Sequence, residues 1–121
     1  MKHDLAPFAS LIAASTDQHI TQGKATLRLR MAVTFTDQSV LHIRENYILL
    51  TGEVDYAYHW QTDNHQLIHR WDNAHQVPFD TSPHHQHIGT EENVQPSEPM
   101  TLLAVLTFIA GRIDKSRLTS S

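Results

Sequence analysis

The sequence predicts one α+β domain over residues 1–121, an antiparallel β-meander of four to six strands covered by a C-terminal helix, with a short N-terminal helix. Three observations support this prediction. Several segments between residues 25 and 72 alternate apolar and polar residues, as half-buried strands do. Residues 102–113 carry an apolar stripe at helical spacing. A chain of 121 residues without a repeat or a linker is expected to form one core.

The N-terminal region predicts a helix followed by an extended segment. Residues 5–14 are largely apolar, and they indicate a helix rather than a signal peptide because a convincing processing site is lacking. Residues 19–21 begin an extended segment, which ends at the turn signal of residues 22–24.

A β-hairpin follows. Its first strand covers residues 25–35, and the inward positions are Leu27, Leu29, Met31, Val33 and Phe35. The outward positions include Thr26, Arg28, Arg30 and Thr34. After a turn at residues 36–39, residues 40–46 return with Leu41 and Ile43 inward and with His42 and Arg44 outward.

Two more strands extend the meander. Residues 54–61 place Val54, Tyr56, Tyr58 and Trp60 on one face and Asp55, Ala57 and His59 on the other. Residues 62–64 form a turn. Residues 66–72 then place Leu67, His69 and Trp71 opposite Ile68, Arg70 and Asp72.

The C-terminal third is predicted to be a loop and a helix. Residues 73–99 contain four prolines and indicate a long, functional loop with a short strand around residues 87–88. Ser97 is expected to cap the helix, and Pro99 suits its first turn. The helical stripe that would cover the sheet consists of Leu102, Leu103, Leu106, Ile109, Ala110 and Ile113.

Composition excludes several classes of function. The chain has no cysteine, which excludes disulfides, thiolate metal sites and a cysteine nucleophile. It contains no apolar run long enough to span a membrane, and the motifs of P-loop NTPases, dinucleotide-binding folds and serine hydrolases are missing. The net charge of −4 opposes electrostatic binding of nucleic acid by the chain as a whole. Any contact with RNA therefore needs a local basic patch.

Ten histidines are an unusual number for this length, and seven lie between His59 and His87. Imidazole serves as acid or base near neutral pH, and arginine binds phosphate with two donors. These are the groups that a metal-independent ribonuclease needs. The candidate catalytic residues are His84, His85, His87, Arg70, Asp72, Tyr58 and His59.

Several of these residues have plainer interpretations. Asp72 can pair with Arg70 as a surface ion pair, or it can orient a histidine of the following loop. The rings of Tyr58, Trp60 and Trp71 can stack on bases, but at strand spacing they more often pack in a core.

Two further possibilities concern metals and charge. His84, His85 and His87 form a possible metal site, although three ligands from one short loop are geometrically awkward. Otherwise these histidines belong to a solvated loop. If the outward faces of the hairpin strands adjoin, Arg28 and Arg30 form a local basic patch with His42 and Arg44. The alternative is a solvated sheet face, and it is favoured for Arg28.

Three segments carry a resemblance to a known family. They are Tyr56-Ala57-Tyr58-His59-Trp60-Gln61, Arg70-Trp71-Asp72-Asn73-Ala74-His75 and Pro83-His84-His85-Gln86-His87. Over about residues 20–113 the chain resembles the TumE family of toxin–antitoxin systems. In that family Pro-His-His tends to follow Asp-Asn-Ala directly, whereas His75-Gln76-Val77 stands there in this chain. The resemblance implies a cytoplasmic prokaryotic protein, a cognate antitoxin as partner and, plausibly, cleavage of RNA.

The leading hypothesis is a toxin-like, metal-independent endoribonuclease that requires no cofactor. In it, His84, His85 or His87 acts as acid or base, Arg70 contacts phosphate, and Tyr58 and His59 assist. The first alternative is a non-enzymatic interaction module that binds a protein through the same Tyr, Trp, Arg and His surface. The second is a metal-binding histidine site. A homodimer that covers the edges of the sheet is a weaker expectation.

Overall fold

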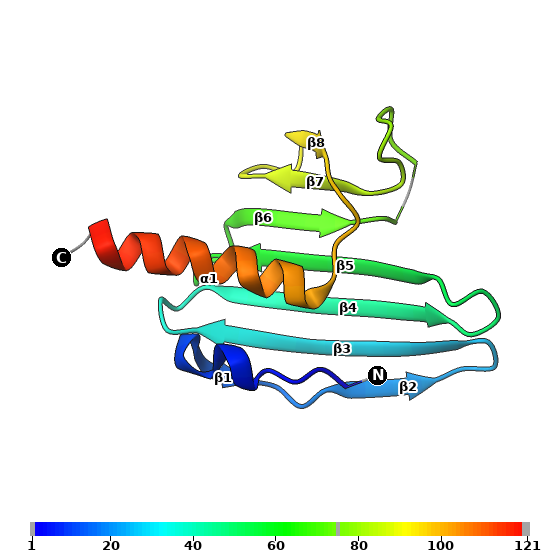
Figure 1. Cartoon of the computed structure of the whole chain (residues 1–121), viewed down its shortest axis with the longest axis horizontal. Helices are drawn as coiled ribbons and strands as arrows, with labels where there is room; N and C mark the ends of the chain where they lie inside the picture. The colour runs from blue at the N-terminus through cyan, green and yellow to red at the C-terminus, as the bar shows by residue number, and fades with distance from the viewer. Residues whose placement is uncertain (1, 75, 120–121) are drawn as a thin grey trace.

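A computed structural model describes residues 2–74 and 76–119, with side chains described as far as Asp114. Within these residues the chain forms an eight-stranded antiparallel sheet, and one helix lies over one of its faces (Figure 1). The elements are η1 (Ala6–Leu11), β1 (Ile12–Ser15), β2 (His19–Gln22), β3 (Thr26–Phe35), β4 (Val40–Ile48), β5 (Val54–Gln61), β6 (Leu67–Asp72), β7 (His85–Ile88), β8 (Val94–Pro96) and α1 (Leu102–Thr119).

The sheet has the strand order β1-β3-β4-β5-β6-β7-β8, and β2 also pairs with β3. Each neighbouring pair is antiparallel, so the predicted α+β meander is confirmed. The sheet exceeds the expected four to six strands because short segments at both ends join it. At the N-terminal end these segments are β1 and β2, which pair with successive parts of β3.

The alternation of residue types in the central strands is confirmed by their burial. Inward side chains of β3 to β6 pack against the apolar side of α1. The buried apolar residues are Leu11, Leu29, Met31, Val33, Phe35, Leu41, Ile43, Tyr56, Tyr58, Trp60, Trp71, Leu102, Val105, Leu106, Ile109 and Ile113. We call the side of the sheet beneath α1 the helix face and the opposite side the open face.

Two predictions about the ends of the chain were wrong. The N-terminal helix ends at Leu11, because Ile12–Ser15 pair with β3 as a strand instead of continuing it. Ser97 does not cap α1, since its hydroxyl donates to the Glu98 carbonyl. Thr101 is the cap, because its Oγ1 accepts a hydrogen bond from the Ala104 amide at 3.2 Å.

The C-terminal region differs from the prediction in two further details. The loop of residues 73–99 contains β8 in addition to the expected short strand, and β8 pairs with β7 at the edge of the sheet. Leu103, which was predicted to belong to the buried stripe, is 64% exposed, whereas Val105, which the prediction left out, is fully buried. None of the helices in the described part of the chain is both long and apolar enough to cross a lipid bilayer.

Candidate functional site

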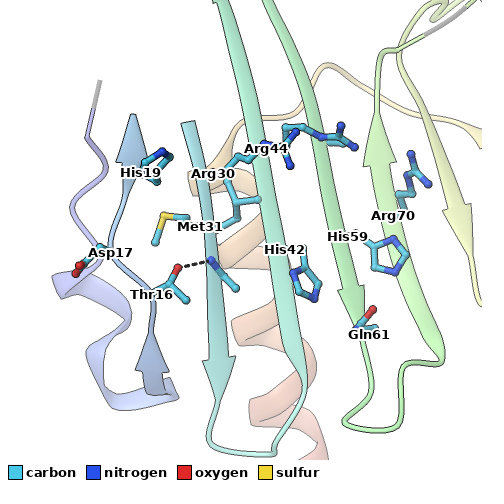
Figure 2. A pocket seen from close by; sticks show the side chains of 13 residues that line it. Thr16, Asp17, His19, Arg30, Met31, His42, Arg44, His59, Gln61 and Arg70 are labelled. Carbon is cyan, nitrogen blue, oxygen red and sulfur yellow. Dashed lines mark hydrogen bonds between the residues drawn. The ribbon is translucent and has the colours of Figure 1, made fainter. Parts of the chain in front are cut away.

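The open face of the sheet contains a hollow of about 750 Å³. Figure 2 shows its side chains projecting from neighbouring strands, with α1 on the far side of the sheet. The polar residues that line it are Thr16, Asp17, His19, Arg30, His42, Arg44, His59, Gln61 and Arg70. A hollow of this size with several converging polar groups is a candidate binding site.

Strand register brings the cationic and imidazole side chains together. Arg30 of β3 lies opposite Arg44 of β4, His42 of β4 lies opposite His59 of β5, and His59 lies opposite Arg70 of β6. Directly opposite residues in antiparallel strands have Cβ atoms about 5 Å apart. The outward positions of four strands therefore form one continuous polar surface.

This surface is basic although the chain is acidic. A second hollow of about 300 Å³ shares Arg30, Arg44 and Arg70 with the first and adds Arg28. Four of the six arginines in the sequence thus line two adjoining hollows. The basic patch proposed from the outward positions of the hairpin is confirmed, and it extends to β6.

Of the three histidines in the hollow, His59 is the least exposed to solvent. It is half-buried, and its pKa lies below the usual value of 6.5, mainly because burial disfavours the charged ring and secondly because Arg70 is cationic. His42 is exposed, and the centroids of the two rings are 6.4 Å apart. A neutral imidazole thus lies beside a second imidazole and an arginine, a combination suited to general acid–base chemistry.

Asp72 links the basic surface to the edge of the sheet. Its carboxylate is fully buried, with Oδ2 3.0 Å from Arg70 Nε and Oδ1 2.9 Å from His85 Nε2. Both contacts are within ion-pair distance of the carboxylate. His87 Nε2 lies 3.7 Å from Oδ2. Both partners expected for Asp72, Arg70 and a histidine of the following loop, are therefore present.

Arg70 is anchored at both ends of its guanidinium. Nε contacts Asp72, and Nη1 lies 3.6 Å from the Glu91 carboxylate. The Arg70 side chain nevertheless keeps 29% of its surface exposed toward the hollow. A fixed and partly exposed guanidinium is well placed to bind an anion.

Two of the predicted site residues lie on the helix face instead. Tyr58 is 1% exposed, and its hydroxyl donates to Glu45 Oε2 at 2.5 Å. Burial and then the Glu45 carboxylate raise the pKa of Tyr58 far above its usual value of 10. His84 stacks on Tyr56, and its Nδ1 lies 2.7 Å from the Tyr56 hydroxyl. Neither side chain is brought together with Arg70.

The tryptophans are also packed in the core. Trp60 donates to Ser39 Oγ at 2.9 Å, and Trp71 stacks on His69 with the ring centroids 4.1 Å apart. Both rings are at least 97% buried, so they are closed to stacking on a base.

Tyr58→Phe is expected to reduce the free energy of unfolding by about 1–3 kcal/mol, because the buried Glu45 carboxylate loses a donor. Urea denaturation measures this loss. Tyr47→Phe is the matched control and should cost less, since the Tyr47 hydroxyl lies 3.5 Å from Glu45 Oε1. A Tyr58→Phe protein with unchanged stability but impaired activity would restore Tyr58 to the catalytic set.

A family model described as "Toxin TumE" matches residues 4–113 of the chain, which is most of its length. The chain belongs to the TumE toxin family. It is therefore a toxin component of a toxin–antitoxin system, a class in which the toxin has an antitoxin partner. Neither a curated protein nor a solved structure matches it significantly.

The site of this TumE-family chain overlaps the predicted residues only in part. His59, Arg70, Asp72, His85 and His87 adjoin one another across β5, β6 and β7. Arg30, His42 and Arg44, which line the hollow, were missing from the predicted catalytic set, and the signal for them was their outward position beside the same strands. His75, where the chain departs from the family pattern, lies outside the described residues.

Proposed function

We propose that this TumE-family toxin is an endoribonuclease that cleaves RNA on the open face of its sheet without a required metal ion. The observation that carries the proposal is the group formed by His42, His59, Arg44 and Arg70 in one hollow. It supplies a base, an acid and cations to a phosphodiester that lies across β4, β5 and β6. Since the substrate is cellular RNA, we place the protein in the cytoplasm of a prokaryotic cell.

The reaction follows from the two imidazoles. Neutral His59 takes the proton of a ribose 2′-hydroxyl, and the 2′-oxygen forms a bond to phosphorus. The bond from phosphorus to the 5′-oxygen breaks, and that oxygen takes a proton from the protonated ring of His42. The ring centroids are 6.4 Å apart in an edge-on arrangement, so one phosphodiester lying over both rings can contact each of them. The products are a 2′,3′-cyclic phosphate and a 5′-hydroxyl.

The arginines stabilise the developing negative charge. Arg44 and Arg70 flank the histidine pair, since Arg44 follows His42 by two residues on β4 and Arg70 lies opposite His59. Both can bind the non-bridging oxygens of the phosphate. Each proton and each charge of the reaction is thus assigned to a side chain of the protein, so no step depends on a metal.

Asp72, His85 and His87 lie next to Arg70 on β6 and β7, at the border of this site. His85 is fully buried and His87 is 8% exposed, which favours positioning over direct contact with RNA. Through its contact with Nε, Asp72 fixes the orientation of Arg70, and His85 contacts the other carboxylate oxygen. We therefore assign Asp72 and His85 as positioning residues.

Arg44→Glu tests the proposal. EDTA-treated wild-type protein is expected to cleave a mixed RNA pool, and the variant is expected to bind RNA about tenfold more weakly, or worse, because a phosphate contact becomes a repulsion. Lys24→Glu makes the same change in net charge in the exposed turn between β2 and β3, and it should retain both binding and cleavage. Filter binding and mapping of the cleaved ends measure the two effects.

The same experiment separates the rival function. If wild-type protein leaves RNA intact at every pH, with or without added metal, and still binds its antitoxin, the ribonuclease proposal fails. The basic face then belongs to a non-enzymatic interaction module. Equal losses in Arg44→Glu and Lys24→Glu would show that net charge, rather than this hollow, governs binding.

A further inference from the structure

A second cluster lies between β6 and β7 at the border of the basic face. Asp72 of β6 lies opposite His85 of β7, and the next outward positions of the two strands, Arg70 and His87, also lie opposite each other. Asp72, His85 and His87 each offer one ligand atom, and these three atoms lie within 4.8 Å of one another. All three residues are buried.

Hydrogen bonds to the backbone orient both rings. His85 Nδ1 lies 2.9 Å from the Pro83 carbonyl, and His87 Nδ1 lies 2.7 Å from the Glu91 carbonyl. A carbonyl only accepts, so Nδ1 of each ring carries the proton that is donated. Nε2 of each ring faces the Asp72 carboxylate, at 2.9 Å for His85 and 3.7 Å for His87.

This is how proteins arrange histidines that bind metals. Ligating imidazoles almost always donate the other ring N–H to a carbonyl or a carboxylate, which fixes the tautomer and the direction of the ligand nitrogen. Here two rings do so, and both direct Nε2 to one carboxylate. Asp72 Oδ2 contacts Arg70 Nε, and Oδ1, which also accepts a hydrogen bond from the Ala74 amide at 3.2 Å, lies on the side of His85.

We propose that Asp72, His85 and His87 bind one divalent transition-metal ion of the Zn²⁺ class. Two imidazoles and one carboxylate are ligands of the type that Zn²⁺ takes, and the chain has no thiolate that would compete. The ion would join β6 to β7 and thereby secure the outer strands of the sheet. The proposal goes beyond RNA cleavage and stands whether or not the chain cleaves RNA.

The structure changes the metal set that the sequence suggested. His84 is not part of the cluster, because its ring stacks on Tyr56. Asp72 takes its place, since the register of β6 and β7 brings that carboxylate between the two buried histidines. Ligands from two strands also remove the difficulty of taking three from one short loop.

Metal binding is tested directly on the full chain. EDTA-treated protein is dialysed against ZnCl₂ and, separately, against CoCl₂, and bound metal is measured by elemental analysis and by the visible absorption of bound Co²⁺. Wild-type protein and His84→Ala should each bind one ion per chain, whereas His87→Ala should lose it. Wild-type protein that stays free of metal, or a His87→Ala variant that binds as well as wild type, overturns the proposal.

A measurement without a variant covers the case in which His87→Ala fails to fold. Two-bond ¹H–¹⁵N NMR spectra of wild-type histidine rings, recorded during titration with ZnCl₂, report which nitrogens coordinate. Coordination at Nε2 of both His85 and His87 supports the site. Changes confined to the exposed rings, such as that of His42, show adventitious binding only and overturn it. Neither readout depends on RNA, so its failure is distinguishable from failure of the ribonuclease proposal.

Discussion

His59→Ala is expected to slow RNA cleavage about 100- to 10,000-fold, the usual contribution of a general base. His59 is the half-buried imidazole between His42 and Arg70, and its lowered pKa keeps it neutral at pH 7. The variant should fold normally, because the side chain contributes to the hollow and not to the core. Single-turnover cleavage rates, with circular dichroism as a check of the fold, measure the effect.

The pH dependence of cleavage provides a second readout of the same residue. Only the neutral ring accepts a proton, so the wild-type rate should fall as pH decreases through a pKa below 6.5. The charge of Arg70 lowers this pKa, so Arg70→Gln should move the acidic limb to higher pH. Arg70→Gln should also reduce the maximal rate, because a phosphate contact is lost.

The control for His59 is His65→Ala, in the exposed turn between β5 and β6. This variant should cleave RNA at close to the wild-type rate and with the wild-type pH profile. If His59→Ala also retains the wild-type rate, the base is another residue and the mechanism proposed above is wrong.

The central strands could be predicted because their burial follows the two-residue period of a β-strand. Val54–Gln61 was predicted with its observed bounds and with Tyr56, Tyr58 and Trp60 on the buried face. β1 and β8 could not be predicted in the same way. They are edge strands of four and three residues, and their extended form depends on pairing with β3 and β7.

The site was harder to predict than the fold, because register across strands is not readable from one segment. The two-residue alternation correctly placed Arg70 and Asp72 on the same face of β6. It also placed His59 and Tyr58 on opposite faces of β5, and Tyr58 is buried on the helix face. The adjacency of Arg30, Arg44 and Arg70 depends on three pairings between strands. His84 and His85 are neighbours in sequence but have different partners, since one bonds to Tyr56 and the other contacts Asp72.

Net charge was a poor guide for a related reason. A charge of −4 describes the whole molecule, but the field at a hollow depends on charges within about a Debye length, roughly 10 Å at ordinary salt. Four arginines on alternate positions of neighbouring strands line the two hollows, against three acidic residues, Asp17, Glu45 and Asp55, so positive charge exceeds negative charge there. An acidic chain can therefore present a basic binding surface.

Asp72→Asn is expected to destabilise the fold by about 3–5 kcal/mol, the usual cost of removing one partner from a buried ion pair. The amide is similar in shape to the carboxylate but uncharged, so Arg70 loses the anion that its Nε contacts within the sheet. His85, which is fully buried 2.9 Å from Oδ1, loses the same partner. Urea denaturation of EDTA-treated protein measures the change, so that any bound metal is excluded from the comparison.

Asp63→Asn makes the same chemical change in the exposed turn between β5 and β6, and it should leave stability within about 0.5 kcal/mol of wild type. A loss of less than 1 kcal/mol in Asp72→Asn would mean that the carboxylate charge is not what holds Arg70 and His85. In that case Asp72 would not qualify as a positioning residue. A large loss together with cleavage that persists in the folded fraction would show that Arg70 does not need this anchor, and it would separate stability from catalysis at this position.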